Sequence, residues 1–490
     1  FKNLTHQIMA FGFIIYFTVI LIVGIITARQ NKTLPDFILA GRNLGPWVVA
    51  FSERASGQSG WLLLGLTGLA YSTGLGDPSG LKLQPAIWAS FGGCLGVIMS
   101  WILIAKRLRI ESEKLGALTL GRFFELKFRG HDPLIRFVTT GIIVFCFIFY
   151  IAAQFDAAGK SLEQTFGFNH LTGVLIGASI IVFYTLMGGF FAVAWTDFIQ
   201  GIIMFVALVA LPLVALYQVG GLEPLINKIV SIDERLLSIG GERDGWILIS
   251  GVIGGLGIGL GYIGQPHVLT RYMSIRSIEE VNKAKWVAII YALLTYLGAV
   301  LMGIVAIAYF GTGYFSDPEK MMPALATSIF PAWLSGMVIC GALAAMMSTA
   351  DSQLLVTTSS IAEDIYHQSI NQNASQSRLV FLSRISTIFV GLLAILLARL
   401  PSSIFDKVLF AWGGLGAALG PPLLLSLWWE KTSRNGVLYG MVIGLFTVII
   451  WENFFKWTGL YSLLPGFSFS LFTVYFMSRK SIVNSVLKVL

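Results

Sequence analysis

A strongly polar run interrupts one of the apolar stretches of the chain. Residues 52–60 read Ser-Glu-Arg-Ala-Ser-Gly-Gln-Ser-Gly, and apolar residues precede and follow them. A charge inside an apolar stretch of membrane-spanning length is costly unless it is paired or hydrated, so Glu53 and Arg54 are candidates for a functional site. Because glycine weakens a helix, we expect the helix that carries this run to unwind there.

A second run rich in helix-breaking residues covers residues 254–266 and reads Gly-Gly-Leu-Gly-Ile-Gly-Leu-Gly-Tyr-Ile-Gly-Gln-Pro. Its glycines and its proline, which lacks a backbone donor, predict a second interruption. Unwound backbone is tolerated at membrane depth only where it lines a cavity enclosed by protein, so the two breaks predict a binding site. Close helix packing is the competing explanation for glycine. It suffices for Gly92 and Gly93 and for residues 413–416, but packing needs no Glu-Arg pair.

The elements around these runs are expected to be membrane-spanning helices. Hydrophobic residues make up 56% of the 490 positions and charged residues 12%, whereas about 25% are charged in a soluble protein. The apolar residues fall in blocks of about twenty, the length that crosses a bilayer. We therefore expect an all-α integral membrane protein. Its thirteen predicted helices cover residues 8–28, 45–73, 83–105, 134–160, 171–189, 191–218, 245–270, 285–310, 331–362, 377–399, 404–428, 435–457 and 460–478.

The direction of these helices follows from the Lys and Arg residues, which accumulate in every second connection. Cytoplasmic loops collect positive charge, so we expect the N-terminus outside and the C-terminus inside. Arg271 and Arg276 belong, on this interpretation, to the cytoplasmic connection after the seventh helix. The basic residues lie in short connectors and on no folded face, so the net charge of +8 is not a sign of nucleic-acid binding.

The chain contains neither a Walker A sequence nor H-E-x-x-H, so no motif supports an ATP-driven pump or a membrane protease, and we do not expect an enzyme. The two polar runs instead lie five helices apart, in helices that the predicted topology orients in opposite directions. This is typical of a secondary transporter with a five-plus-five inverted repeat, in which solute and ions bind at the broken helices. Two mirrored breaks favour alternating access over a passive channel.

Five motifs in the same order along the chain resemble those of the solute:sodium symporter family. They are Ser59-Gly-Trp-Leu-Leu63, Trp195-Thr-Asp197, Gly261-Tyr-Ile-Gly-Gln-Pro-His267, Ala344-Ala-Met-Met-Ser-Thr349 and Ala411-Trp-Gly-Gly-Leu-Gly-Ala-Ala-Leu-Gly-Pro421. The similarity runs from about Asp36 to Gly466 and is strongest to bacterial members that transport proline. It implies a multi-pass protein of the bacterial inner membrane with a LeuT-type core. The first repeat would cover residues 45–218 and the second 245–428, with one extra helix before them (8–28) and two after them (435–478).

The resemblance implies a sodium site where the first broken helix meets the eighth helix of the core. Its ligands would be backbone carbonyls near Ala55 and Gln58, the carbonyl of Ala345, and the hydroxyls of Ser348 and Thr349. A hard monovalent cation needs several oxygens, and unwound carbonyls supply them without burying net charge. The alternative is that both hydroxyls only bond to their own helix.

For the solute, the resemblance implies contacts from both broken helices and from one further helix. The six positions are Ser59, Trp61, Tyr150, Ile258, Tyr262 and Pro266. A tyrosine ring and the free amides of half-helix N-termini suit a zwitterion with an apolar ring.

The chain departs from the proline-transporting members at three positions of this region. They carry an aspartate at the place of Gly57, a methionine at that of Gln58 and a tryptophan at that of Ile258. This chain has Glu53 and Arg54 one turn earlier, and Asp351 three residues after Ser348.

We hypothesise that Asp351 or Glu53 replaces the missing carboxylate and that Arg54 neutralises the other. The alternative is a Glu53–Arg54 network that only locks the helix. Asp197 matches a family aspartate near a second cation site in some relatives, and a helix-start cap is the competing role.

The function expected from these residues is import of L-proline, a small-molecule substrate, coupled to sodium across the lipid bilayer. Another small neutral amino acid or a betaine, or a proton in place of sodium, stays open because of the departures at Gly57, Gln58 and Ile258. A solute sensor without transport is the alternative of a different class, and the short segment after the last helix argues against it.

Overall fold

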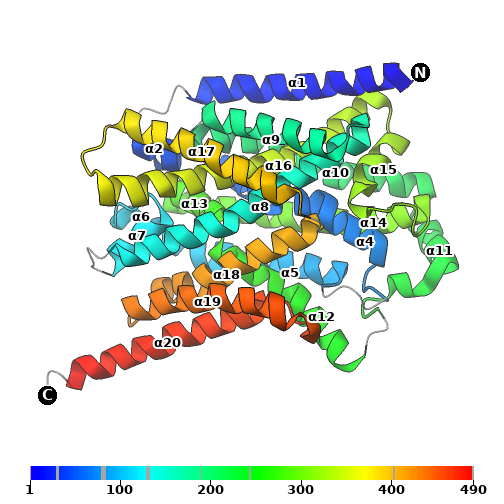
Figure 1. Ribbon diagram of the computed structural model, residues 1–490. Helices are drawn as coiled ribbons and strands as arrows, with labels where there is room; N and C mark the ends of the chain where they lie inside the picture. Colours follow the sequence, from blue (N-terminus) through cyan, green and yellow to red (C-terminus); the bar gives the residue numbers. More distant parts are fainter. Residues whose placement is uncertain are drawn as a thin grey trace.

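The structure is a computed structural model that describes residues 2–28, 33–78, 84–128, 133–187, 189–241, 244–400 and 403–487. Long helices lie side by side with roughly parallel axes (Figure 1). The described residues contain no β-strand, only a single parallel bridge between Leu44 and Ile275. Nine of the described helices are long and apolar enough to cross a membrane. The all-helical membrane architecture expected from the composition is confirmed.

The long helices follow the predicted blocks closely, although several extend further. They are α1 (Lys2–Ala28), α5 (Ala86–Met99) continued by η3 (Ser100–Ala105) and α6 (Lys106–Lys114), α8 (Leu134–Phe166), α9 (His170–Met187), α10 (Phe190–Val219), α14 (Ile278–Phe310), α16 (Ala332–Ser360) continued by η7 (Ile361–Ile370), α17 (Gln376–Ala398), α18 (Ile404–Trp428), α19 (Arg434–Phe454) and α20 (Leu463–Leu487). Short helices occupy several connections: α2 (Leu34–Leu39), η1 (Ala40–Arg42), α7 (Leu120–Lys127), α11 (Leu222–Asp233), η4 (Glu234–Leu237), η6 (Pro318–Lys320), α15 (Met321–Ile329) and η8 (Lys456–Thr458).

The first broken helix consists of α3 (Pro46–Gly60), a π-helical segment η2 (Trp61–Leu66) and α4 (Thr67–Thr73). The interruption falls at Ser59, whose φ of 48° and ψ of −172° are not helical. Only glycine adopts a positive φ without strain, so a serine there needs local support. Its own hydroxyl supplies it, because Ser59 Oγ accepts the backbone N–H of Trp61 at 3.3 Å. The predicted break is confirmed and lies near the end of the polar run.

The second broken helix consists of α12 (Gly245–Gly257), a tight 3₁₀ segment η5 (Ile258–Gly264), an extended Gln265 and α13 (Pro266–Ser274). Proline fits the first turn of α13 because no intrahelical partner exists there for its missing N–H. Glycine is required for close approach: a Cβ on Gly261 would lie 1.9 Å from Nε1 of Trp412. The packing role expected for Gly92 is also confirmed, since a Cβ there would lie 2.1 Å from the carbonyl oxygen of Gly255.

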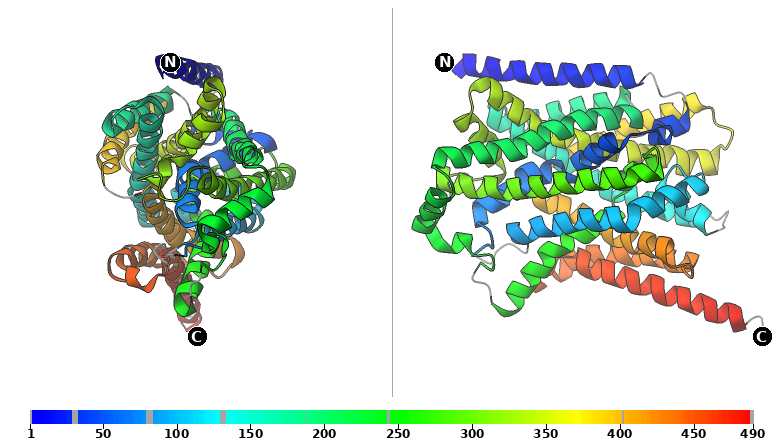
Figure 2. Two further views of the ribbon diagram at one scale, coloured as in Figure 1. Left: turned by 90° about the vertical axis from the view of Figure 1, so that its right-hand side faces the viewer. Right: turned by 180° about the vertical axis from the view of Figure 1, so that it is seen from behind.

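The two breaks lie inside the bundle, where the residues around Ser59 and Gln265 are buried, although α12 continues to the edge of the bundle with Trp246 and Ile247 exposed. Helix α3 packs against α10, α14 and α16, whereas η5 packs against α5 and α18. Seen along the helix axes, α1 and α20 lie on opposite sides of the bundle (Figure 2). Both breaks are therefore shielded by protein, as unwound backbone requires.

Candidate functional site

The first break meets α16 through two hydroxyl groups. Ser348 Oγ donates to the carbonyl of Ala55 at 3.2 Å, and Thr349 Oγ1 donates to that of Ser56 at 3.0 Å. The same hydroxyls lie 3.1 Å and 2.9 Å from the carbonyl of Ala345 on their own helix. Both arrangements considered for these hydroxyls, across to α3 and back to α16, are therefore present together. Four of the five predicted cation ligands (Ala55, Ala345, Ser348 and Thr349) meet at this crossing.

Gln58, the fifth predicted ligand, is engaged elsewhere by its described contacts. Its carbonyl accepts the backbone N–H of Trp61, which it shares with Ser59 Oγ. Its side chain points to α14, where Nε2 donates to Thr295 Oγ1 at 2.6 Å. No described contact joins Gln58 to the hydroxyls of α16.

Directly beside the crossing lies a buried group of charges that we call the aspartate cluster. It consists of Asp197 on α10, Arg271 on α13, Asp351 and Ser352 on α16, and Ser52 and Ser56 on α3, all fully buried. Arg271 Nη2 donates to Asp197 Oδ2 at 2.7 Å. Ser52 Oγ donates to the same oxygen at 2.7 Å and Ser56 Oγ at 3.1 Å. Three helices, α3, α10 and α13, are thus joined at one carboxylate.

The charges of the aspartate cluster do not balance. Two carboxyl groups, Asp197 and Asp351, face one guanidinium group, Arg271, so one negative charge is left over if all three are ionised. Asp197 Oδ1 and Asp351 Oδ2 are buried and have no hydrogen-bond partner among the described residues. Ser352 connects the cluster to the crossing, because its hydroxyl donates to the Ser348 carbonyl at 2.6 Å and lies 3.2 Å from Asp351 Oδ1. A cation or a proton would restore the balance.

Two expectations about these charges are corrected by the geometry. Arg271 is not in a cytoplasmic connection: it lies within α13, is fully buried, and also donates from Nη1 to the His267 carbonyl at 2.6 Å. Asp197 is not a helix-start cap, because α10 begins at Phe190 and the carboxylate contacts other helices.

Glu53 and Arg54 form a separate, fully buried pair. Arg54 Nε donates to Glu53 Oε2 at 2.6 Å, and Nη2 contacts Oε1. Trp101 Nε1 also donates to Glu53 Oε2, at 3.2 Å. The guanidinium group lies 5.1 Å from the ring centre of Tyr262. Arg54 is therefore the partner of Glu53, and Asp351 belongs to the aspartate cluster.

Three of the predicted solute positions gather around the first break. Ser59 Oγ lies 3.5 Å from Tyr150 Oη on α8. Tyr262 Oη lies 3.4 Å from the Gly57 carbonyl and 2.8 Å from Tyr296 Oη. Residues from α3, α8 and η5 thus meet at one place.

Of the other three predicted solute positions, Trp61 and Ile258 contact side chains that also contact Tyr262, whereas Pro266 faces a cavity. Trp61 packs against Tyr296 and Phe405, with ring centres 5.9 and 6.1 Å apart. The Ile258 carbonyl accepts Trp412 Nε1 at 2.9 Å. Pro266 lines a small cavity of about 20 Å³ together with residues of α7, α10 and α16. Among the larger cavities, one of about 80 Å³ is lined by Gly65 and Gly68 of the first broken helix, and those of about 270 and 320 Å³ lie beside α8 and α18 and between α1, α10 and α16.

Sequence reasoning missed several residues of this region. Trp412 lies inside one of the five motifs, but its role follows only from packing, its ring centre being 4.6 Å from that of Tyr262. Gln154 follows Tyr150 by one turn and accepts the Gly60 N–H at 3.1 Å. For Gln154, the signal available in the sequence was its spacing of four residues from Tyr150, because residues i and i+4 of a helix share a face.

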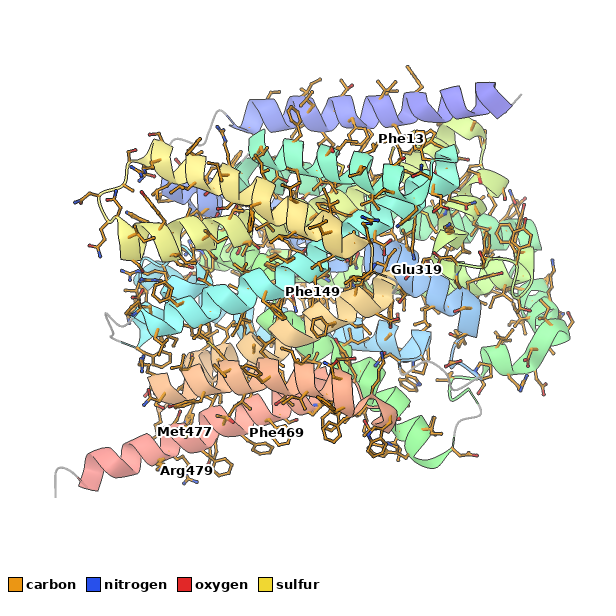
Figure 3. The ribbon with its side chains drawn as sticks, in the orientation of Figure 1. Phe13, Phe149, Glu319, Phe469, Met477 and Arg479 are labelled. Atoms are coloured by element: carbon orange, nitrogen blue, oxygen red, sulfur yellow. The ribbon has the colours of Figure 1, made fainter. Side chains whose placement is uncertain are left out.

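Glu319 of η6, labelled in Figure 3, contacts α8 and the start of α18. Its carboxylate accepts the backbone N–H groups of Ile404 and Phe405 at the start of α18, both at 3.1 Å, and Lys160 Nζ of α8 at 2.5 Å. Burial raises the pKa of Glu319, and the positive charge of Lys160 offsets part of that rise.

Comparison with known proteins gives four concordant findings. The model of the sodium:solute symporter family matches residues 37–444. The high-affinity proline transporter PutP of Bacillus subtilis (strain 168) is 38% identical over 462 residues, which cover 94% of this chain and 95% of that protein. The sodium/proline symporter of Escherichia coli (strain K12) is 36% identical over 478 residues, covering 94% and 91%. A solved structure of a Na⁺-coupled sialic acid symporter, in a substrate-bound outward-open state, matches with a TM-score of 0.80 at 17% identity over 96% of this chain and 98% of that one.

Proposed function

This chain belongs to the sodium:solute symporter family, and from that premise we propose that it imports L-proline together with sodium by alternating access. The resemblance drawn from the five motifs is confirmed by the family match and by relatives at 38% and 36% identity. The chain is thus a multi-pass membrane transporter and not an enzyme, and sodium is its co-transported ion.

The observation that carries the sodium proposal is the convergence of oxygen atoms between α3 and α16. The Ala55 and Ala345 carbonyls lie within hydrogen-bond distance of the hydroxyls of Ser348 and Thr349. Neutral oxygens of this kind can replace the hydration shell of a hard monovalent cation. We assign sodium to these four residues, with the Gln58 carbonyl as a fifth ligand that becomes available when the Trp61 N–H turns away.

The solute is assigned to the break beside this crossing. Ser59, Tyr150 and Tyr262 surround it, and Trp61, Ile258 and Pro266 complete the proposed set. An indole ring lies close to Ile258, because Trp412 bonds its carbonyl and packs on Tyr262. An aromatic wall therefore exists although position 258 carries no tryptophan, and such a wall suits a five-membered apolar ring.

We assign the coupling charge to Asp351, with Asp197 in support. Glu53 already has Arg54 as its partner, so it is a less suitable carboxylate for the ion than Asp351, one oxygen of which has no hydrogen-bond partner among the described residues. A Cβ on Gly57 would lie 3.3 Å from Arg54 Nη2. An aspartate introduced at position 57 would therefore contact Arg54 and compete with Glu53.

The finer architecture is part of the same proposal. We assign thirteen spans, with the N-terminus outside and the C-terminus inside the bacterial inner membrane. Residues 45–218 and 245–428 form the inverted repeats of a LeuT-type core, residues 8–28 precede it and residues 435–478 follow it. The broken helices at Ser59 and at Gln265 then occupy equivalent places in the two repeats, as the site of an inverted-repeat transporter requires.

Uptake of labelled proline into proteoliposomes, with sodium and proton gradients imposed separately, tests the proposal. Uptake driven by sodium is the expected result. Failure of uptake under both gradients would refute the proline assignment, and uptake driven by protons alone would refute the sodium assignment. A betaine and other small neutral amino acids, added as competitors, test the alternative solutes.

A further inference from the structure

Gln154 on α8 contacts the first helix break from the same side as Tyr150. The two residues are one helical turn apart, so they share a face of α8. Tyr150 Oη lies 3.5 Å from Ser59 Oγ, and Gln154 Oε1 accepts the backbone N–H of Gly60 at 3.1 Å. Both side chains of α8 are fully buried. The first amide after the break is therefore held by a side chain from another helix.

The bond to Gly60 fixes the orientation of the carboxamide. Because Oε1 accepts this N–H, the amide group Nε2 points elsewhere, and it is buried without a hydrogen-bond partner among the described residues. The indole Nε1 of Trp61, on the residue after Gly60, is a second buried donor without a described partner. Buried polar groups are nearly always hydrogen-bonded, so these donors need acceptors that the described part of the protein does not supply.

We propose that Gln154 recognises the carboxylate of the transported solute, an inference that rests on the proposed function because it needs an amino acid bound at the break. A carboxylate carries only acceptors and so complements the free donors of Gln154 and Trp61. Gln154 is also neutral. An arginine in its place would add a buried positive charge close to the sodium assigned to Ala55 and Ser348, whereas an amide binds the carboxylate and leaves the ion to balance its charge.

Two substitutions separate recognition of the carboxylate from packing. Gln154→Glu keeps the size of the side chain and the oxygen that accepts the Gly60 N–H, but exchanges the Nε2 donors for a second acceptor. Gln154→Met keeps the length and removes both polar ends. Gln200→Met is the matched control. Gln200 is also fully buried, but it lies on α10 and donates to Tyr16 Oη of α1 at 2.9 Å.

The affinities of the purified full-length chain for proline and for prolinamide, measured by calorimetry in saturating sodium, give the test. Prolinamide keeps the ring and the amine and replaces the carboxylate with a neutral amide. We expect the preference for proline over prolinamide to fall about tenfold or more in both Gln154 variants, the scale of one hydrogen bond to a charged group. Gln200→Met should leave this preference unchanged.

The outcomes separate this inference from the proposed function. Wild-type protein that binds no proline would overturn the proposed function and this inference with it. If wild-type protein binds proline but the Gln154 variants lose affinity for both ligands in equal proportion, the inference alone is overturned, and Gln154 only supports the break. Partial misfolding does not affect this comparison, since it lowers the amount of binding protein and not the ratio of the two affinities.

Discussion

Replacing Arg271 with methionine perturbs the aspartate cluster at its only cation. The substitution removes the bonds from Nη2 to Asp197 Oδ2 (2.7 Å) and to Ser56 Oγ (2.9 Å), from Nε to Ser52 Oγ (3.1 Å) and from Nη1 to the His267 carbonyl (2.6 Å). The formal charge of the cluster changes from −1, two carboxylates and one guanidinium, to −2. Removing one partner of a buried ion pair costs about 3–5 kcal/mol, and we expect Arg271→Met to lower the unfolding free energy by an amount of that size.

The Asp197→Asn/Arg271→Met double variant is the matched control. It removes one charge of each sign and restores the cluster to −1, with Asp351 as the remaining carboxylate. Since replacing both members of a buried pair is often close to neutral, we expect it to recover most of the loss. Unfolding free energies from SDS titration of the purified variants measure both effects. The proposed role of Arg271 would be refuted if the unfolding free energy of Arg271→Met lay within about 1 kcal/mol of the wild-type value. It would also be refuted if the double variant were no more stable than Arg271→Met.

Three further predictions concern other parts of the molecule. Ser348→Ala and Thr349→Val each remove one proposed ligand, so the sodium concentration for half-maximal proline uptake should rise about tenfold or more. Thr358→Val is the control, because the Thr358 hydroxyl bonds the Leu354 carbonyl of the same helix at 2.8 Å, and it should leave this concentration unchanged. An equal rise in the control and in the two ligand variants would contradict the sodium assignment. Gly261→Ala places a Cβ 1.9 Å from Trp412 Nε1 and should lower the unfolding free energy by about 1–3 kcal/mol in SDS titration. Gly141→Ala in α8, with open space around the added Cβ, should not lower it, because alanine favours a helix over glycine. Because burial raises the pKa of Glu319, the folded protein holds a proton that the unfolded chain releases, and this contribution to stability falls as the pH rises from about 4 through the raised pKa. Glu319→Gln cannot ionise and should show a flatter dependence of the apparent melting temperature on pH; parallel curves would show that Glu319 does not titrate in this range.

The helix breaks could be predicted from residue types, but their positions could not. Glycine and proline mark both runs, and the second break indeed lies at Gln265, beside the proline. The first break lies at Ser59 and not at Gly57 or Gly60, because the Ser59 hydroxyl supports the non-helical backbone by accepting the Trp61 N–H. A serine with positive φ has no signature in the sequence.

Arg271 shows why the charged part of the site was harder to predict. It follows the predicted end of the seventh helix by one residue, and a rule that counts basic residues by position places it in the loop. Its partner Asp197 is 74 positions away, so only the packing of α10 and α13 against α3 brings the two together. Glu53 and Arg54 are the opposite case. Adjacent residues on a helix do not normally face each other, yet these two pair directly. The sequence offered this pair both within the hypothesis that Asp351 serves the ion and as a network that only locks the helix.

The shared hydroxyls of Ser348 and Thr349 have a consequence for the speed of the transport cycle. Each hydroxyl has one proton and two acceptors within reach, one on α3 and one on α16. At the proposed site, an arriving ion therefore needs only a rotation about the Cβ–O bond of each hydroxyl. Each proton turns to one lone pair of a carbonyl within reach, so that the lone pairs of the hydroxyl and the other lone pair of that carbonyl stay free for the ion. Such side-chain rotations take picoseconds to nanoseconds, whereas helix and domain movements take microseconds to milliseconds. The ion contacts at the proposed site can thus form and break many times within one conformation, so we expect the movement of the helices, and not the rearrangement at the ion, to set the turnover rate.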